Sequence, residues 1–360
     1  MTNVLIYSGL TWFGIGESHC HNLTRSLAKD FTVLYLEVPY CNDQTRPHIN
    51  NVATVQIPDN VKLISAKKSY NFGINYFIKS QIHSLKSFFK YKKSFDVAIL
   101  YNIYDVPFLL LCKIYNKKVI YAIVDDYPEL TFNYYIHLLL KFNETFFLML
   151  NNASFVTAQA LLKKSPKSIY IPNTIRTNEP VIKHPIEKPV TTSYRVGLVG
   201  SIGKWIDTET INDVATLLPT VEFHIVGSGD KENELAKLPN MIKHGQVSKE
   251  RVNELMQTFD VGLICFKINE ITNSVSPIKL FEYFNAGLPV ITSPTKELLQ
   301  YKDIVFYYHS PQELAKLIKE LKNNPNLVKS RISLGLDYIK KNNWEVIGEK
   351  YNKIITKVIN

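Results

Sequence analysis

The segment from Asn273 to Ile291 combines residue types that would bind a phosphorylated ligand. Ser276 is a natural helix N-cap and Pro277 suits the first helical position, so a helix is predicted to begin here. The unpaired backbone N–H groups and the positive end of a helix bind phosphate readily. Lys279 would lie in the first turn, where the helix dipole disfavours a cation unless an anionic ligand offsets the cost. Glu282, about one turn further along the same face, could accept hydrogen bonds from ribose hydroxyls, whereas the alternative is a helix with ordinary surface charges.

A second candidate is the sequence Gly-Ser-Ile-Gly-Lys-Trp at residues 200–205, which follows a predicted buried strand. Open α/β sheets bind their ligands at the carboxyl ends of strands. Two glycines next to Lys204 suit a diphosphate, to which the lysine would supply a point charge. The motif is too short for a P-loop, and a solvent-facing lysine is the alternative interpretation.

A third candidate is the loop at residues 8–18, which follows the first predicted strand and contains Gly14 and Gly16. Glycines let the backbone approach a ligand closely, and Trp12 and Phe13 in the same loop could stack on a sugar. The loop lacks the third glycine of a dinucleotide-binding fingerprint. An ordinary loop between a strand and a helix is the alternative.

Acid–base chemistry would come from Asp125 and Asp126, which end a buried strand just before Tyr-Pro. A carboxylate at this place would face an inter-domain cleft and could act as a general base, with Asp126 as first choice and Asp125 as second. Capping of the next helix is the alternative role for Asp126. His19 and His21, near the start of a predicted helix, are further acid–base candidates, although a surface or packing role is more typical of a single histidine.

Apolar runs rich in Val, Ile and Tyr alternate with helical patterns along almost the whole chain, and continuous apolar strands are typical of parallel sheets buried on both faces. The predicted strands are residues 3–8, 32–38, 61–65, 96–101, 118–124, 153–158 and 168–172, followed by 195–200, 221–227, 240–245, 260–266, 288–292 and 303–308. Residues 173–193 contain three prolines and interrupt the alternation as a linker. The sequence therefore predicts an α/β protein with two doubly wound, Rossmann-like domains that face each other across a cleft.

Composition excludes several classes of protein. A chain of 360 residues is too long for one ordinary core and fits two domains. Four scattered cysteines with no CxxC pair exclude a disulfide framework and a cysteine zinc site, and they favour a reducing compartment. The first residues lack the pattern of a signal peptide, and no apolar run reaches the roughly 20 residues of a membrane span. We therefore expect a cytoplasmic protein without a transmembrane segment.

Positive charge is concentrated in the first half of the chain, where residues 1–180 carry 19 Lys and Arg against 12 Asp and Glu. Eight lysines and no acid lie between Asn60 and Phe95, and four apolar residues recur there at helical spacing. These are Ile78, Ile82, Leu85 and Phe89. An amphipathic helix of this kind is typical of an anionic membrane surface, and a core helix with a solvated basic side is the alternative. Nucleic acid is not an expected partner, because no recognition motif accompanies the basic residues.

Over nearly the whole chain the sequence resembles the GT-B glycosyltransferases, in particular family 4-like bacterial enzymes that build teichuronic acid, capsular and other surface polysaccharides. The resemblance is strongest from Val196 to Pro294. It implies an acceptor-binding domain at residues 1–175, completed by a C-terminal helix at about 342–360 that crosses back onto it. It also implies a domain at residues 190–340 that binds a nucleotide-sugar donor.

Glu282 matches the second acid of the family's Glu–seven residues–Glu motif, which binds the donor ribose. Ser274 stands where the first acid belongs and Ser201 where an arginine is common, which leaves Lys204 as the cation for the diphosphate. Because the missing acid normally contacts the transferred sugar, retention and inversion both stay open, the latter with an aspartate base. The residues expected to bind the donor are Gly14, Gly16, Gly200, Ser201, Lys204, Gly227, Ser274, Val275, Ser276, Pro277, Lys279, Leu280 and Glu282, and those expected to bind the acceptor are Trp12 and Phe13.

The resemblance implies transfer of a sugar from a UDP-linked donor to a growing bacterial surface polysaccharide. The basic amphipathic helix would place the protein at the inner face of the cytoplasmic membrane, beside a lipid-linked acceptor. No metal or other cofactor is expected, because there is no acidic DxD motif in a suitable loop and helix ends with lysine would neutralise the diphosphate. A nucleotide-sugar epimerase of the same fold and a non-catalytic nucleotide- or carbohydrate-binding protein are the alternatives. The missing dinucleotide fingerprint argues against a dehydrogenase.

Overall fold

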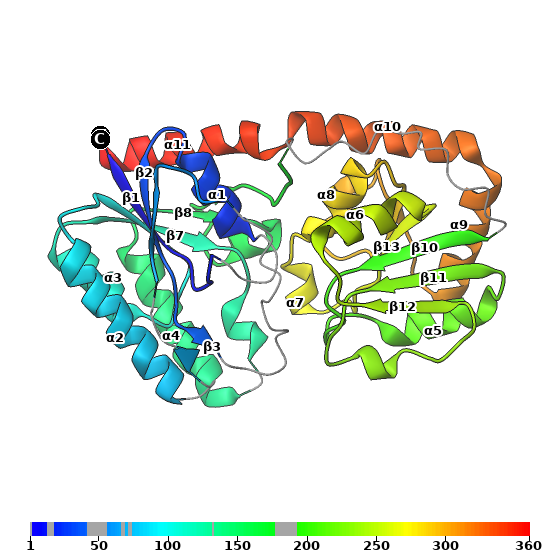
Figure 1. Ribbon diagram of the computed structural model, residues 1–360, viewed down its shortest axis with the longest axis horizontal. Coiled ribbons are helices and arrows are strands. Elements are labelled where there is room, and N and C mark those ends of the chain that lie inside the picture. The colour runs from blue at the N-terminus through cyan, green and yellow to red at the C-terminus, as the bar shows by residue number, and fades with distance from the viewer. Residues whose placement is uncertain are drawn as a thin grey trace. The chain divides into compact units, whose positions relative to one another are not determined.

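The computed structural model describes residues 2–12, 18–41, 56–65, 69–70, 74–131, 133–176 and 193–360. The chain divides into two compact units (Figure 1). Unit 1 consists of Met1–Pro172 together with Trp344–Asn360, and unit 2 consists of Asn173–Asn343. Most of the predicted linker, residues 177–192, lies outside the described residues. Its first residue is tied to unit 2, because the side-chain amide of Asn173 donates to the carbonyl of Ser276 at 2.7 Å.

The main sheet of unit 1 is parallel, with the strand order β4-β2-β1-β6-β7-β8-β9. Its strands are β1 (Asn3–Tyr7), β2 (Thr32–Leu36), β4 (Val61–Ile64), β6 (Val97–Leu100), β7 (Lys118–Ile123), β8 (Ala153–Val156) and β9 (Ile169–Tyr170). Each lies within a predicted strand, and the central strands are buried on both faces, as their continuous apolar runs indicate. A small parallel pair, β3 (Tyr40–Cys41) with β5 (Ser69–Tyr70), was not predicted, because a two-residue strand carries no periodic pattern.

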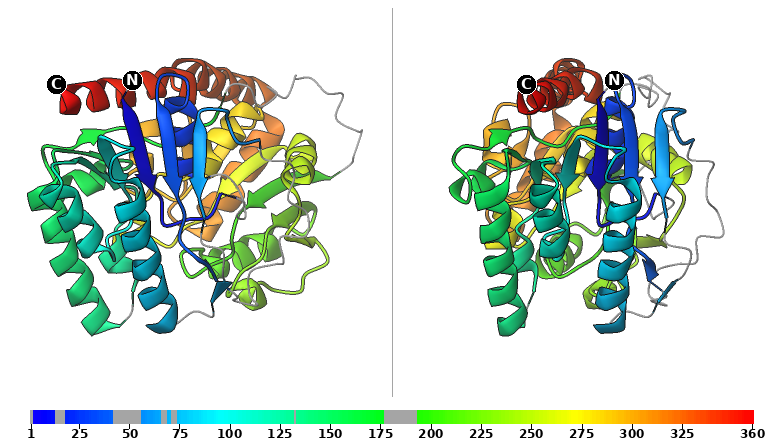
Figure 2. Two further views of the ribbon diagram at one scale, coloured as in Figure 1. Left: turned by 60° about the vertical axis from the view of Figure 1, so that its left-hand side comes forward. Right: turned by 90° about the vertical axis from the view of Figure 1, so that its left-hand side faces the viewer.

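Two layers of helices cover the two faces of this sheet. Alternate residues of β1 point to opposite sides, with Val4 and Ile6 in one core and Leu5 and Tyr7 in the other. The first core is covered by α1 (His19–Leu27) and α11 (Trp344–Ile359), and the second by α2 (Ile74–Tyr91), α3 (Val106–Ile114) and α4 (Tyr134–Leu150). Helices α2, α3 and α4 lie side by side (Figure 2).

The C-terminal helix α11 completes unit 1. It packs against α1 and buries Trp344, Ile347 and Tyr351 in the core that also contains Val4 of β1. The helix that was expected to cross back onto the N-terminal part of the chain is therefore present, and it supplies one wall of the core.

Unit 2 repeats the doubly wound arrangement with a parallel sheet in the order β12-β11-β10-β13-β14-β15. Its strands, which correspond to the six predicted ones, are β10 (Tyr194–Val199), β11 (Val221–Val226), β12 (Met241–Gly245), β13 (Val261–Ile264), β14 (Val290–Thr292) and β15 (Phe306–Tyr307). Its helices are α5 (Thr208–Leu217), α6 (Lys249–Thr258), α7 (Glu270–Asn273), α8 (Ile278–Asn285), α9 (Pro311–Asn323) and α10 (Pro325–Lys341). The two predicted Rossmann-like folds are thus confirmed.

None of the helices in the described part of the chain combines the length and the sustained apolar character that crossing a bilayer requires. Cys20, Cys112 and Cys265 are buried free thiols. Burial raises the pKa of the Cys20 thiol, so it packs as a small neutral side chain.

Candidate functional site

The strand order of unit 2 creates a switch point between β10 and β13. From β10 the chain moves outward to β11 and β12, and it then returns to β13 on the other side of β10. In open α/β sheets, ligands bind outside the carboxyl ends of the strands at such a point. The loop at residues 200–205 follows β10, and residues 273–277 with α8 follow β13. Both segments that were predicted to bind the donor therefore belong to the strands that flank the switch point.

The loop after β10 lies closely against the loop after β11. Gly200 has a φ of 143° and Gly227 a φ of 132°, which other residues rarely adopt. A Cβ added at Gly227 would lie 2.0 Å from the carbonyl oxygen of Gly200, so only glycine fits there. The N–H of Gly200 donates to the carbonyl of Val226 at 2.9 Å. Both glycines therefore shape the loop by backbone conformation. Ser201 and Lys204 are the exposed side chains of this loop that were predicted to bind the donor.

Helix α8 is fixed to the end of β10 by Tyr283. The Tyr283 hydroxyl accepts a hydrogen bond from the N–H of Val199 at 2.9 Å and donates to the carbonyl of Gly197 at 3.1 Å. Its ring packs directly against Gly262. A Cβ added at Gly262 would lie only 2.6 Å from Cγ of the Tyr283 ring. Tyr283 was missed in the sequence, although its position three residues after the apolar Leu280 indicates the buried side of the helix.

The start of α8 lies one residue later than predicted. Pro277, and not Ser276, occupies the N-cap position, and the N–H of Leu280 donates to the Pro277 carbonyl at 3.1 Å. The Ser276 hydroxyl accepts instead from the backbone N–H of Asn173 at 3.2 Å. Because the N-cap residue offers no side-chain acceptor, the first N–H groups of α8 suit an anionic ligand.

Lys279 and Glu282 form an ion pair with each other on α8. The Glu282 side chain is 17% exposed and that of Lys279 is 31% exposed. The cost of a lysine in the first turn, which an anionic ligand was expected to offset, is offset in this structure by Glu282. The pair places a cation and a carboxylate acceptor beside the uncapped helix start.

The remaining predicted donor residues near α8 have different surroundings. Ser274 is buried, and its hydroxyl finds no hydrogen-bond partner within the described ranges. Val275 is partly exposed. Leu280 is fully buried in the core between α8 and the sheet, so the prediction that its side chain binds the donor is wrong.

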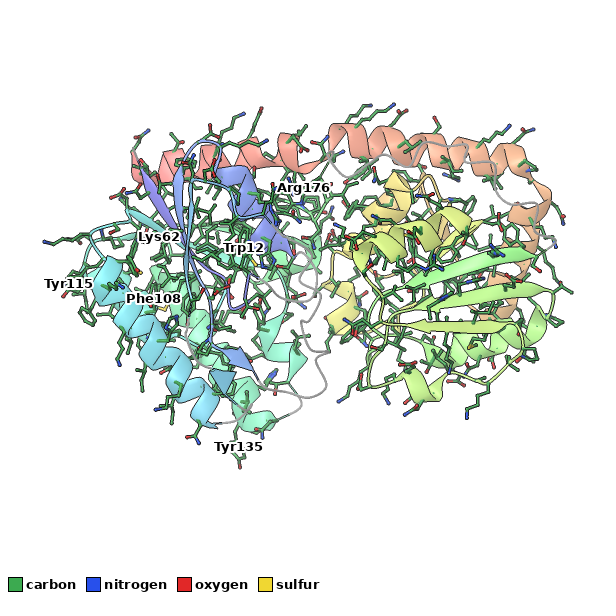
Figure 3. All side chains as sticks on the ribbon, in the orientation of Figure 1. Trp12, Lys62, Phe108, Tyr115, Tyr135 and Arg176 are labelled. Carbon is green, nitrogen blue, oxygen red and sulfur yellow. The ribbon has the colours of Figure 1, made fainter. Side chains whose placement is uncertain are left out.

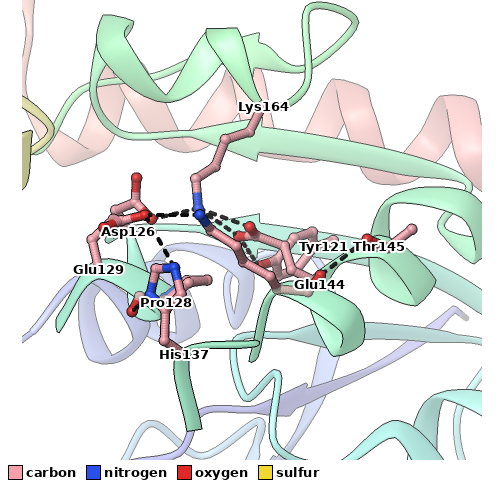
Figure 4. Close-up of polar contacts among 9 residues, drawn as sticks. Tyr121, Asp126, Pro128, Glu129, His137, Glu144, Thr145 and Lys164 are labelled. Atoms are coloured by element: carbon pink, nitrogen blue, oxygen red, sulfur yellow. Dashed lines mark hydrogen bonds and ion pairs between the residues drawn. The ribbon is translucent and has the colours of Figure 1, made fainter. Parts of the chain in front are cut away.

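In unit 1, Asp126 belongs to a buried ion cluster after β7 (Figure 4). Its carboxylate lies 2.5 Å from the ammonium of Lys164, which also lies 2.7 Å from the carboxylate of Glu144. The hydroxyl of Tyr121 donates to Glu144 at 3.2 Å. Asp126 precedes a short 3-10 helix, but its side chain does not cap that helix. The ion pair with Lys164 therefore gives Asp126 a structural role.

Asp125 differs from its neighbour. It is partly exposed, and its carboxylate makes no hydrogen bond or ion pair to any described residue. Desolvation by its surroundings and then the charge of Asp126 raise the pKa of Asp125 to about 7. A carboxyl group with a pKa near neutrality suits proton transfer. The geometry therefore favours Asp125 over Asp126 as a general base, which reverses the predicted order.

The two histidines of α1 have packing roles. Nδ1 of His19 lies 2.8 Å from the hydroxyl of Tyr101, and Nε2 lies 2.7 Å from that of Tyr351. Burial lowers the pKa of His19 to about 3, so the ring is neutral at physiological pH. His21 is also buried, and its Nε2 donates to the carbonyl of Thr11 at 3.0 Å. Neither geometry supports the predicted acid–base role.

Trp12 lies inside unit 1 (Figure 3). The residue is 2% exposed and packs edge-on against the ring of Tyr35, while its backbone N–H donates to Glu37 at 2.5 Å. The prediction that Trp12 stacks on an acceptor sugar is therefore wrong, because its apolar ring is part of the core. Phe13, Gly14 and Gly16 lie outside the described residues.

Across the described ranges, no three His, Cys, Asp or Glu side chains are grouped so that they could hold a metal ion. Unit 1 has a carboxyl group with a raised pKa after β7. Unit 2 has, separately, an uncapped helix start, lysines and hydroxyls after β10 and β13. These are the means for binding a phosphate and moving a proton.

Two doubly wound parallel units, the first completed by the C-terminal helix, define the GT-B fold. Residues 208–341 match the family described as glycosyl transferase-like. Over 120 residues the chain is 32% identical to TuaH of Bacillus subtilis, a protein named for glycosyl transfer in teichuronic acid biosynthesis. That match spans 31% of this chain and 30% of the relative.

Solved structures share the fold over the whole chain. Sucrose-phosphate synthase from Thermosynechococcus elongatus has a TM-score of 0.78 at 13% identity, with 99% of both chains covered. Anabaena Alr3699/HepE in complex with UDP-glucose has a TM-score of 0.74 at 13% identity, covering 99% of this chain and all of that one. The comparisons confirm the predicted resemblance to GT-B glycosyltransferases and support a glycosyltransferase.

Proposed function

We propose that the protein transfers a sugar from a UDP-sugar to a glycan acceptor, with the donor bound by unit 2. The switch point of unit 2 carries the proposal: the loop at Gly200 and the uncapped start of α8 follow neighbouring strands, and Tyr283 holds α8 against β10. Such an arrangement suits a nucleoside diphosphate. The Anabaena relative in fold was crystallised with UDP-glucose, which supports uridine as the donor base.

In the proposed complex the diphosphate lies at the start of α8, where backbone N–H groups donate to its oxygens. Lys204 and Lys279 offset its charge, and Glu282 accepts hydrogen bonds from the ribose. The buried hydroxyl of Ser274 is proposed to bond to the transferred sugar, because it finds no partner within the described ranges. Since protein groups offset the charge of the diphosphate, we propose that transfer needs no metal ion.

Asp125 is the proposed general base. It takes the proton from an acceptor hydroxyl while that oxygen attacks the anomeric carbon, and the bond from this carbon to UDP breaks as UDP leaves. Direct displacement of this kind inverts the anomeric carbon. Proton NMR of the product distinguishes inversion from retention.

The proposed acceptor is a growing, lipid-linked bacterial surface polysaccharide, which unit 1 would hold at the inner face of the cytoplasmic membrane. The name of the Bacillus subtilis relative supports a cell-envelope polysaccharide. Peripheral attachment would then keep the enzyme next to an acceptor that cannot leave the membrane.

A screen of UDP-sugars by calorimetry and by UDP release from the purified protein tests the proposal. We expect binding of one UDP-sugar, slow release of UDP, faster release when an acceptor oligosaccharide is added, and no loss of rate in EDTA. Conversion of the donor sugar to its epimer without an acceptor would identify an epimerase. Binding with no release of UDP under any condition would leave a binding protein, and either outcome contradicts the proposal.

A further inference from the structure

Helices α2, α3 and α4 expose large apolar side chains on the side that faces away from the sheet of unit 1. Ile114 of α3 is 71% exposed, and Tyr135 and Met149 of α4 are 80% and 73% exposed. Ile82 and Phe89 of α2 are exposed as well. Tyr115 and Tyr135 lie at the margin of the unit in Figure 3. We call the outer side of these three helices the three-helix face.

The outer side of α4 is apolar. Tyr135, Phe142 and Met149 follow one another at intervals of seven residues and therefore share one side of the helix. The opposite, buried side carries Asn143, which donates to the carbonyl of Ile103 at 3.1 Å, and Glu144 of the ion cluster. The buried side also carries Leu140 and Phe147, which pack in the core of unit 1. Helix α4 is therefore apolar on its outer side as well as on its inner side, whereas an ordinary surface helix has a polar outer side.

Helix α2 likewise exposes apolar side chains on its outer side. The apolar residues that recur at helical spacing in its sequence include Ile78 and Phe89, and about half of each is exposed. The side that faces α3 and the sheet is built from serines and Phe88, and Ser84 donates to the buried Asp105. Ile78, Ile82 and Phe89 of the apolar side predicted from the sequence are therefore exposed, although α2 also packs on the core through Phe88 and has solvated lysines, as the alternative of a core helix expected.

The three-helix face carries positive charge and no exposed carboxylate on its helices. The sequences of α2 and α3 contain no Asp or Glu, and Glu144 of α4 is buried. Lys79, Lys86 and Lys90 of α2 are exposed. Lys92, directly after α2, lies 4.1 Å from the centre of the Tyr115 ring, so cation and aromatic groups lie together.

We propose that the three-helix face docks on a bilayer that contains anionic lipids, with the apolar side chains of α4 and α3 entering the interface and the lysines of α2 contacting headgroups. The inference rests on the proposed function in one respect, because a lipid-linked acceptor is what brings the protein to a bilayer. The apolar and basic surface is observed in unit 1 independently of that function. An apolar patch rimmed by lysines is the chemistry that interfacial binding requires.

Charge decides between a bilayer and a second copy of this chain. Pairing two copies through the same face would bring lysines against lysines with no exposed carboxylate on these helices to neutralise them. A bilayer with anionic headgroups neutralises the lysines and receives tyrosine and phenylalanine at the depth they favour. The observations therefore favour a lipid surface.

Flotation of the full chain with vesicles tests the proposal. One set contains phosphatidylcholine alone, and the other contains phosphatidylcholine with phosphatidylglycerol. We expect binding to the anionic vesicles, weaker binding as salt is raised, and at least a tenfold loss of partitioning in the combined variant Tyr135→Ser, Phe142→Ser, Met149→Ser. The combined variant Lys86→Glu, Lys90→Glu, Lys93→Glu should lose binding to a similar extent.

Matched controls come from unit 2. The combined variant Lys316→Glu, Lys319→Glu, Lys322→Glu changes three exposed lysines of α9, and Leu217→Ser with Leu299→Ser changes exposed apolar residues. Both should float like the wild type. All variants should keep the melting temperature and the rate of UDP release that the wild type shows without vesicles. If no protein, the wild type included, releases UDP, the proposed function is rejected, whereas the flotation result still tests the three-helix face.

Two results would overturn the inference. The first is equal recovery in the vesicle-free fraction with neutral and anionic lipids at low salt. The second is concentration-dependent self-association in sedimentation velocity that the Tyr135, Phe142 and Met149 variant abolishes, combined with no vesicle binding, which would assign the face to a second copy.

Discussion

At the end of β7, Asp125 and Asp126 are adjacent in sequence but have opposite surroundings. Asp126 is buried against the ammonium of Lys164, whereas Asp125 is partly exposed and makes no bond to a described residue. The Asp-Asp-Tyr-Pro motif in the sequence located the pair at the end of a strand and made Asp126 the first choice as a base, whereas the surroundings of the two carboxylates favour Asp125. The reason is that Lys164 lies far along the chain, so only the fold brings its charge to Asp126.

The raised pKa of Asp125 predicts a pH profile. A base must be deprotonated, so kcat/KM should rise as the pH increases through about 7, and Asp125→Asn should lower turnover at least a hundredfold. Because the pKa is about 7 when folded and 3.8 ordinarily, the folded state holds this proton more tightly. The stability contributed by the protonated group is fully present below about pH 4 and is lost progressively as the pH rises from 3.8 to about 7.

Melting curves give an independent readout of the same residue. Asp125→Asn removes a carboxylate that the folded state disfavours, so its melting temperature should exceed that of the wild type by at least about 2–4 °C at pH 8, by less at pH 5, and should approach it below about pH 4. Asp126→Asn is the comparison variant, because it removes an ion pair and should destabilise the fold. Without the charge of Asp126 the pKa of Asp125 falls, so the rate profile should move to lower pH and still depend on pH. A wild-type rate that does not change between pH 5.5 and 8.5 would reject Asp125 as the base.

The Lys279–Glu282 pair is expected to bind the donor. Glu282→Ala and Lys279→Ala should each weaken UDP-sugar binding by roughly 1.5–3 kcal/mol, which is about tenfold or more, because each removes a charge-assisted hydrogen bond. Isothermal calorimetry measures the change. Arg251 and Glu254 form a matched pair three residues apart on α6, and alanine at either position should leave donor affinity unchanged. Equal affinities for the α8 and α6 variants would show that α8 does not hold the donor.

At the scale of elements, Lys164 joins β7 to α4 through two buried carboxylates. Lys164→Met would leave Asp126 and Glu144 without their cation, and we expect it to lower the free energy of unfolding by about 3–5 kcal/mol. Lys141→Met is the control, because Lys141 is exposed and lies 3.4 Å from the partly exposed Glu129, where loss of a pair costs about 0–1 kcal/mol.

Urea unfolding followed by circular dichroism measures both changes. Similar midpoints for the Lys164 and Lys141 variants would mean that the cluster stays solvated and adds little to stability. A larger loss for Lys164→Met at unchanged m-value would establish that the network holds α4 against the sheet.

Helix α2 shows what periodicity predicts and what it leaves open. The spacing of Ile78, Ile82 and Phe89 correctly indicates a helix with an apolar side, since spacing reports only that the residues share a side. It does not report which side meets the core. Ser84, which bonds the buried Asp105, and Phe88 occupy the inner side, and this depends on partners in α3 that the sequence pattern of α2 does not contain.

At the scale of the whole molecule, the strands were predictable and several site residues were not. Continuous apolar runs such as residues 118–124 predict strands buried on both faces, and the alternation with helices predicts two doubly wound folds. Gly200 and Gly227 were predicted to bind the donor, and the structure shows that both shape their loops through φ values that other residues rarely adopt. Trp12 was predicted to contact a sugar, but its side chain points into the core. An aromatic residue in a loop has no periodic neighbours that would indicate which way its side chain points.

The last helix belongs to the first unit, and this has a consequence for how the chain is made. Unit 2 is continuous from Asn173 to Asn343, so the ribosome completes it before it reaches Trp344. The segment up to Pro172 is made first but lacks the wall against which His19 and Phe155 pack, because that wall is Tyr351 and its neighbours. At about 5–20 residues per second, the nascent chain waits roughly 10–40 s for it. The unit whose synthesis starts first is therefore the last to close, and during that interval its open core is a surface for chaperones.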